Sequence, residues 1–147
     1  MTRLVKLAGA LAVAAAMTVL PMTARADDKD TIDYRQNIMK ALDAHTAALG
    51  MMVSTQIEPS NIQKHVDAIA LNAKAALKSF EAKVPGGDTK PEVWDKWDDF
   101  SKRMNEFAAN ADAMAKAAKT GGVPVIMDQM VTALTCKGCH DVYRVKK

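Results

Sequence analysis

The chain has 147 residues, with 20 Lys or Arg and 17 Asp or Glu side chains, and this length corresponds to a single domain. Arg3, Lys6 and Arg25 lie in an N-terminal leader, so 17 basic and 17 acidic residues remain in the rest of the chain. This balanced charge argues against nucleic acid or an anionic membrane as the partner.

Residues 1–26 have the composition of a cleavable secretory signal peptide. A short positive region is followed by an apolar stretch over residues 7–20 and by the small-x-small tripeptide Ala-Arg-Ala at residues 24–26. The apolar stretch of about 14 residues falls short of the roughly 20 that cross a bilayer, which disfavours a retained anchor. We therefore predict export, a mature domain over residues 27–147, and no stable membrane insertion after the signal is removed.

Hydrophobic periodicity predicts four helices in the mature chain and almost no strand. The first spans residues 31–54, where apolar side chains recur at alternating spacings of three and four. The second begins at an S-x-x-Q capping box that starts at Ser60, and it ends at Pro85, which two glycines follow.

The third predicted helix begins at a T-x-x-E capping box that starts at Thr89 and ends at Gly121-Gly122. Pro124 occupies the first turn of the fourth helix. Connections of about 4 to 8 residues favour antiparallel neighbours. The predicted fold is therefore all-α, an antiparallel up-down-up-down four-helix bundle.

Two pairs of ring side chains lie on these helices. Trp94 and Trp97 are expected to be large core residues at a helix contact, not parts of an electron path. His45 and His65 are expected to be surface or boundary residues, not ligands.

A C-x-x-C-H motif at residues 136–140 predicts covalent attachment of a c-type haem. Cys136 and Cys139 would form thioethers with the vinyl groups, and His140 would ligate the iron. The fourth predicted helix continues into this motif, and spacings of three and four place all three side chains on one face of it. Because this attachment is completed outside the cytoplasm, the predicted location is the periplasm.

Two other uses of the motif are less well supported. A thioredoxin-like C-x-x-C needs a βαβ context, which the chain lacks, and structural zinc needs a fourth ligand from a distant residue. A haem-free metal-binding or interaction protein therefore stays as an alternative. Tyr143 and Arg144 follow one turn later and are candidates for haem contact, against a half-buried helix-end role for Tyr143 and simple solvation for Arg144.

Arg35 lies on the inward stripe of the first predicted helix. A buried unpaired charge is costly, so a haem propionate is its expected partner. The alternative is a side chain that reaches solvent, with an ion pair to Asp33 or Glu92.

Seven methionines remain after the leader, and composition alone does not select one as a sixth iron ligand. However, the sequences CKGCHDVYR (136–144), YRQ (34–36) and PEVW (91–94) together resemble the class II c-type cytochromes, the cytochrome c′ family. The resemblance covers essentially the whole mature chain. It implies a four-helix bundle with haem near the C-terminus and, in high-spin members, an apolar residue over the iron, four positions after the Arg of the first helix.

That position is Met39 here, and the resemblance to low-spin members implies that Met39 is the sixth iron ligand. The predicted function is a low-spin, His/Met-ligated, monohaem electron carrier of the periplasm, not an enzyme, that meets redox proteins in transient complexes. The alternative is a high-spin cytochrome c′-like protein that binds NO or CO. Family members are frequently dimers, so a homodimer is possible, although no surface stripe in this chain assigns one.

Overall fold

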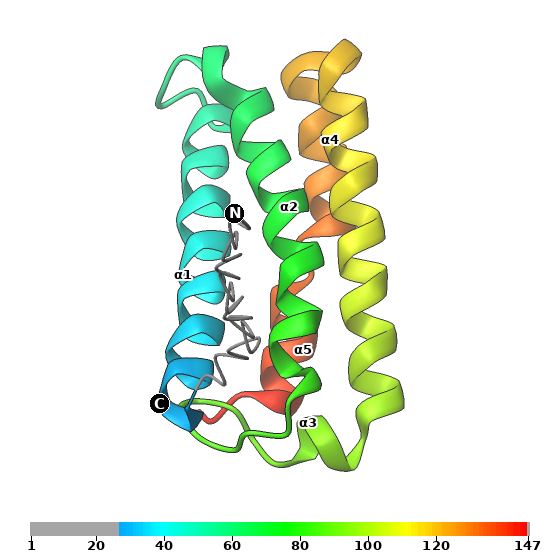
Figure 1. Ribbon diagram of the computed structural model, residues 1–147. Helices are drawn as coiled ribbons and strands as arrows, with labels where there is room; N and C mark the ends of the chain where they lie inside the picture. The colour runs from blue at the N-terminus through cyan, green and yellow to red at the C-terminus, as the bar shows by residue number, and fades with distance from the viewer. Residues whose placement is uncertain (1–26, 147) are drawn as a thin grey trace, which may run out of the picture.

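A computed structural model describes residues 27–146, which form an elongated bundle of helices (Figure 1). The elements are α1 (Asp28–Val53), the 3-10 turn η1 (Pro59–Asn61), α2 (Ile62–Glu81), α3 (Glu92–Asp95), α4 (Trp97–Ala133) and α5 (Cys136–Tyr143). The described residues contain two isolated β-bridges and no strand. Within the same residues, no helix is long and apolar enough to cross a membrane. The predicted signal peptide, residues 1–26, lies outside the described residues.

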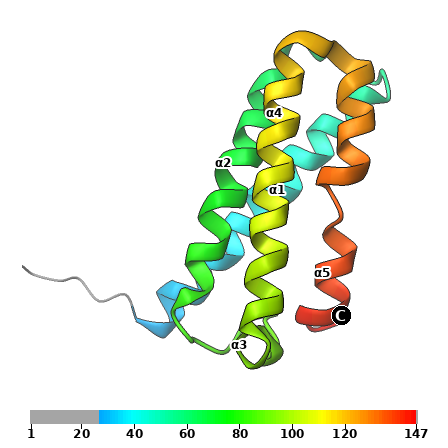
Figure 2. The same ribbon diagram turned by 90° about the vertical axis from the view of Figure 1, so that its right-hand side faces the viewer.

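A sharp turn at Gly122 divides α4 into two arms. Gly122 has φ 62° and ψ −161°, a left-handed conformation that side-chain-bearing residues adopt at a cost. The second arm turns back beside the first and continues into α5, as Figure 2 shows. Pro124 lies in the first turn of this second arm, as predicted. The two arms together with α1 and α2 confirm the antiparallel four-helix bundle.

The packed core lies where α1, α2 and α4 face one another. Several of its residues have no exposed surface: Leu49, Val66, Ile69, Ala73, Ala76, Ala111, Met114 and Ile126. The alanines let the helix backbones approach closely, while each large side chain contributes about 1.5–3 kcal/mol by leaving water. Trp94 and Trp97 are partly buried against this core, which confirms their predicted packing role.

The helix starts differ from the sequence prediction. Pro59 begins η1, and the N–H of Ser60 donates to the Glu58 carboxylate at 3.1 Å. α2 therefore begins at Ile62 and has no side-chain cap. Gln63 instead donates to the Ala115 carbonyl at 3.0 Å, which ties α2 to α4. The predicted capping box at Thr89 is also wrong, since α3 follows Pro91 and has no side-chain cap. In both places a proline starts the turn and displaces the expected hydroxyl.

Candidate functional site

The C-x-x-C-H motif forms the first turns of α5 and lies on the wall of a cavity of about 660 Å³. The opposite walls come from α1 and the first arm of α4. Its lining includes Met39, Leu42, Asp43, Thr46, Met104, Phe107, Cys136, Cys139 and His140. This size is typical of sites for small molecules and cofactors, and the apolar wall residues alternate with polar and charged ones such as Arg103, Glu106 and Lys137.

A second cavity of about 560 Å³ adjoins the first and extends towards the α2–α3 loop. Arg35, Phe80, Phe100 and Tyr143 belong to this second cavity alone. Six residues line both cavities: Met39, Asp43, Met104, Cys139, His140 and Arg144. The two cavities together therefore form one continuous site around α5, and it contains every residue that the sequence analysis selected as a site residue.

The environment of the motif keeps its thiols protonated and its imidazole neutral. Cys136 is exposed and Cys139 is half-buried, yet for both thiols the loss of hydration against the cavity wall raises the pKa. For His140, burial lowers the pKa, and the positive charge of Arg144 lowers it further. Neutral imidazole is the form that binds a metal, so His140 is suited to ligate iron.

Met39 lies on α1 and is half-buried against the core. It lines both cavities together with His140, which lies on α5. Met104, from α4, also lines both cavities and is buried. The site therefore holds two thioethers, of which only Met39 was selected from the sequence.

Arg35 is buried, with 2% of its surface exposed, and its charge is only partly compensated. Its Nη2 donates to the carbonyl of Val84 at 2.8 Å, and the guanidinium lies over the rings of Phe80 and Trp94 at 4.8 and 5.4 Å. Its Nε and Nη1 are buried and have no hydrogen-bond partner among the described residues.

The predicted alternative for Arg35, a side chain that reaches solvent, is wrong. Asp33 pairs with Lys29 instead. Burial lowers the pKa of Arg35, but a guanidinium remains protonated in proteins, so this site has a cation with two unused donors at the cavity wall. An anionic group such as a haem propionate fits that requirement, because carboxylates accept from guanidinium in charge-assisted bonds.

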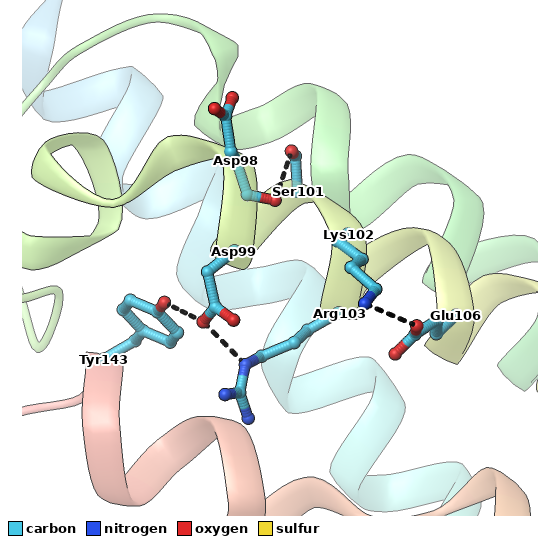
Figure 3. A network of polar contacts seen from close by, with 7 residues as sticks. All are labelled: Asp98, Asp99, Ser101, Lys102, Arg103, Glu106 and Tyr143. Carbon is cyan, nitrogen blue, oxygen red and sulfur yellow. Dashed lines mark hydrogen bonds and ion pairs between the residues drawn. The ribbon is translucent and has the colours of Figure 1, made fainter.

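Tyr143 anchors the end of α5 to α4 (Figure 3). Its hydroxyl donates to the Asp99 carboxylate, which also accepts from Arg103 Nε at 2.7 Å. Burial and this carboxylate raise the pKa of Tyr143 to about 12, while the bonds from Arg103 and Tyr143 lower the pKa of Asp99. The ring packs edge-on against Phe100 at 5.1 Å and is buried. Tyr143 therefore has the structural role at the helix end that sequence analysis left open, although it is more buried than expected, and it also belongs to the cavity wall.

Main-chain bonds from the α2–α3 loop hold the same end of α5. The amide of Lys90 donates to the carbonyl of Tyr143 at 3.0 Å, and the amide of Val145 donates to the carbonyl of Asp88 at 2.9 Å. The Lys90 ammonium adds a bond to the Val142 carbonyl at 3.2 Å. The C-terminal turn of the C-x-x-C-H helix is thus fixed from two sides, by α4 and by this loop.

Sequence reasoning did not select Asp43. It lies one turn after Met39 on α1 and lines both cavities. Its negative charge adds to the rise that burial causes in the pKa of Cys136, and it opposes the fall that burial causes in the pKa of His140. The four-residue spacing from Met39 was the signal that would have identified it, since such residues share a helix face.

Comparison with known proteins agrees with this arrangement. Residues 30–144 match the family described as Cytochrome C′. A cytochrome c′ of Pararhodospirillum photometricum is 36% identical over 124 residues, which cover 77% of this chain and 94% of that protein. Cytochrome c prime from Alcaligenes xylosoxidans, as a ferrous variant with bound NO, has a similar fold, with a TM-score of 0.77 at 25% identity over 84% of this chain and 99% of that chain.

A carbon monoxide-bound variant of the same Alcaligenes protein has a TM-score of 0.76 at 25% identity, with 82% of this chain and 98% of that chain covered. The similarity therefore extends over the bundle and the motif together, not over the fold alone. From the family match and these relatives, the chain belongs to the cytochrome c′ family and is a monohaem c-type cytochrome with a covalently attached haem c.

Proposed function

We propose that the protein is a periplasmic haem protein that binds a small diatomic gas, NO or CO, on the side of the haem that faces α1. The observation that carries this proposal is the pair of adjoining cavities between α5 and α1, in a chain whose structural neighbours include NO-bound and CO-bound proteins. The comparisons favour this function over electron transfer, which was the first expectation from the sequence.

Each site residue has a defined part in this proposal. The thiols of Cys136 and Cys139 keep their hydrogen at neutral pH, and an S–H group adds across a vinyl double bond without a leaving group. His140 supplies a neutral imidazole nitrogen to the iron, and Arg35 supplies two free donors to a propionate. When bound, the haem provides the iron that takes the gas, and its potential and ligand access depend on the surrounding protein groups.

Met39 determines how accessible the iron is. A thioether on the iron would occupy the position that a gas needs, whereas a thioether that only packs against the cavity wall leaves that position free. A second candidate function follows from this residue: if Met39 ligates the iron, the protein is the low-spin electron carrier with transient redox partners. The observation in favour of this candidate is that Met39 lines both cavities together with His140.

Carbon monoxide binding by the ferrous holoprotein tests the proposal. We expect a five-coordinate, high-spin ferrous spectrum and rapid CO binding. The pair of variants Met39→Leu and Met104→Leu makes the result specific, because both methionines line both cavities and only Met39 lies on α1. Under the gas-binding proposal both variants keep a five-coordinate spectrum.

If the wild-type iron is six-coordinate and CO binds only to the Met39→Leu variant, the result would contradict gas binding and support the electron carrier. If the coordination of the iron changes only in Met104→Leu, Met104 and not Met39 is the methionine that ligates the iron. A host that attaches haem also tests the haem-free alternative, since the mass of the product reports the adduct on Cys136 and Cys139 directly.

The same proposal includes the roles of the site residues, the export of the chain and its possible partners. Cleavage after residue 26 would release the domain into the periplasm, and N-terminal sequencing of the secreted protein tests it. No residue of the site is assigned a catalytic role. A homodimer is tested by sedimentation of the holoprotein.

A further inference from the structure

We propose that His45 and His65 form a second metal site, separate from the haem, which binds one divalent transition-metal ion and prefers Cu²⁺. His45 lies on α1 and His65 lies on α2, and neither residue lines the two haem-site cavities. The two helices lie side by side in the bundle (Figure 1), so the pair bridges neighbouring helices.

The spacing of the two imidazoles is that of a chelating pair. The Nδ1 atoms are 3.1 Å apart, and the ring centroids are 5.2 Å apart with an angle of 60° between the ring planes. Two nitrogens 3.1 Å apart, each about 2.05 Å from one ion, subtend an angle of about 100° at the ion. That angle lies between the roughly 90° of square coordination and the roughly 109° of tetrahedral coordination, so both rings reach one ion with little movement.

The protonation of the two imidazoles permits a metal ion to replace the hydrogen bond between them. In the metal-free protein one Nδ1–H donates to the lone pair of the other Nδ1, so at least one ring is neutral. When both rings are neutral, the metal needs the lone pairs of both Nδ1 atoms. The donor ring provides its lone pair by moving its proton from Nδ1 to Nε2, and the metal then takes the place of the shared hydrogen. Both rings stay neutral, no net proton is released, and two metal–nitrogen bonds replace one hydrogen bond.

The pair lies at the boundary between core and solvent. Both histidines are half-buried. On the half-buried side the residues one turn away are small, namely Ala41, Ala48 and Ala68, whereas the buried side is lined by Leu42, Leu49, Ile62 and Ile69, so a hydrated ion would approach from the solvent side. No group of three or more His, Cys, Asp or Glu residues within the described range is placed to hold a metal, so water completes the coordination. Imidazole ligands and the general order of divalent affinities then favour Cu²⁺ over Ni²⁺ and Zn²⁺.

Copper titration of the ferric holoprotein tests this site. The ferric state is used because ferrous haem would reduce Cu²⁺. The chain contains only three histidines, and in the holoprotein His140 is taken up by the haem under the proposed function, so a copper EPR signal with two imidazole nitrogens has one possible source. The variants are His45→Gln and His65→Gln, and the control is Lys64→Gln, which changes the neighbour of His65 and keeps both imidazoles.

We expect one Cu²⁺ per chain with two nitrogen ligands in the wild type and in Lys64→Gln. Affinity should fall at least about tenfold in each histidine variant, since loss of a direct ligand is at least as severe as the 10–100-fold losses seen for outer partners. Zn²⁺ should raise the melting temperature of the wild type but not of the histidine variants, because it links α1 to α2 only in the folded state.

Two results would overturn the site: no stoichiometric copper binding by the wild type, or equal copper affinity in the wild type and both histidine variants. Unchanged haem spectra and helical circular dichroism in the variants exclude unfolding or loss of haem as the cause. Because the readout is the copper signal, failure of this inference leaves the proposed gas binding unaffected, and failure of gas binding leaves the copper result unaffected.

Discussion

The two ends of the bundle solve different packing problems. Towards the end near the α4 turn, apolar residues have no exposed surface, namely Leu49 in the last turns of α1, Ile69 in the first half of α2 and Met114 about two turns before Gly122. At the end that holds α5, two cavities separate the helices, and a buried cation with free donors lies on the wall. Side chains therefore fill one end of the bundle and only part of the other end. The other part is shaped for a group that the polypeptide does not supply.

We expect the greatest loss of stability from a substitution in the packed end of the bundle. Ile69→Ala should lower the free energy of unfolding by about 2–5 kcal/mol, because Ile69 has no exposed surface and its removal leaves a cavity. Denaturant unfolding measures the change. The control is Leu71→Ala on the same helix, where 70% of the side chain is exposed and the change should stay within about 0.5 kcal/mol. Equal losses in the two variants would mean that this end is not tightly packed.

The size of the next effect depends on the cofactor. Arg35→Met should destabilise the holoprotein by about 1.5–3 kcal/mol, because a charge-assisted bond is lost. The same change in a haem-free Cys136→Ser/Cys139→Ser background should stay within about 1 kcal/mol, because relief of an uncompensated buried charge offsets the lost bond to Val84. Chemical unfolding of both pairs measures the difference. Identical losses with and without haem would remove the propionate from the proposal.

The turn that separates the two arms of α4 gives a third comparison. Gly122→Ala should cost about 1–2 kcal/mol, since φ is 62° there, whereas Gly50→Ala within α1 should stabilise by about 0.5–1 kcal/mol. An added Cβ meets no atom within 4 Å at either position, so backbone conformation alone accounts for the opposite signs. Thermal unfolding measures both. Stabilisation by both substitutions would contradict the left-handed turn.

The smallest effect at neutral pH concerns the end of α5. A phenol pKa raised from 10 to about 12 on folding contributes stability that is complete below pH 10 and is lost as the pH rises towards 12. Tyr143→Phe should remove that dependence. Stability curves of the two proteins between pH 9 and 12 provide the measurement, and parallel curves would mean that the hydroxyl is not held by Asp99.

The sequence predicted the bundle because its signals are local. Gly121-Gly122 and Pro124 mark the turn of α4, and apolar periodicity marks the faces. The predicted capping boxes failed because Pro59 and Pro91 start turns that compete with them. The sequence also predicted one continuous last helix, whereas the chain breaks between α4 and α5 at Leu134 and Thr135.

The site was partly predictable for the same reason. The C-x-x-C-H motif is a local signal, and the spacing of Met39 from Arg35 came from a family resemblance that the comparisons confirm. Met104 was missed because its place in the site depends on how separate helices meet, whereas Asp43 was missed although its four-residue spacing places it on the same helix face as Met39. The choice between gas binding and electron transfer depends on whether one flexible thioether reaches the iron, which sequence periodicity does not encode.

The amide-to-carbonyl bonds between the α2–α3 loop and the last turn of α5 have a consequence for evolution of the site. Side-chain replacements at Asp88, or at Lys90 by any residue except proline, keep these bonds, whereas Gly86 and Gly87 have φ values of 135° and 61° and do not tolerate a side chain well. A change in loop length is different, because it would shift the paired backbone groups and rotate the helix that carries His140. Insertions before Asp88 should therefore be rarer than substitutions there, and they are a practical way to tilt the haem without altering any residue that touches it.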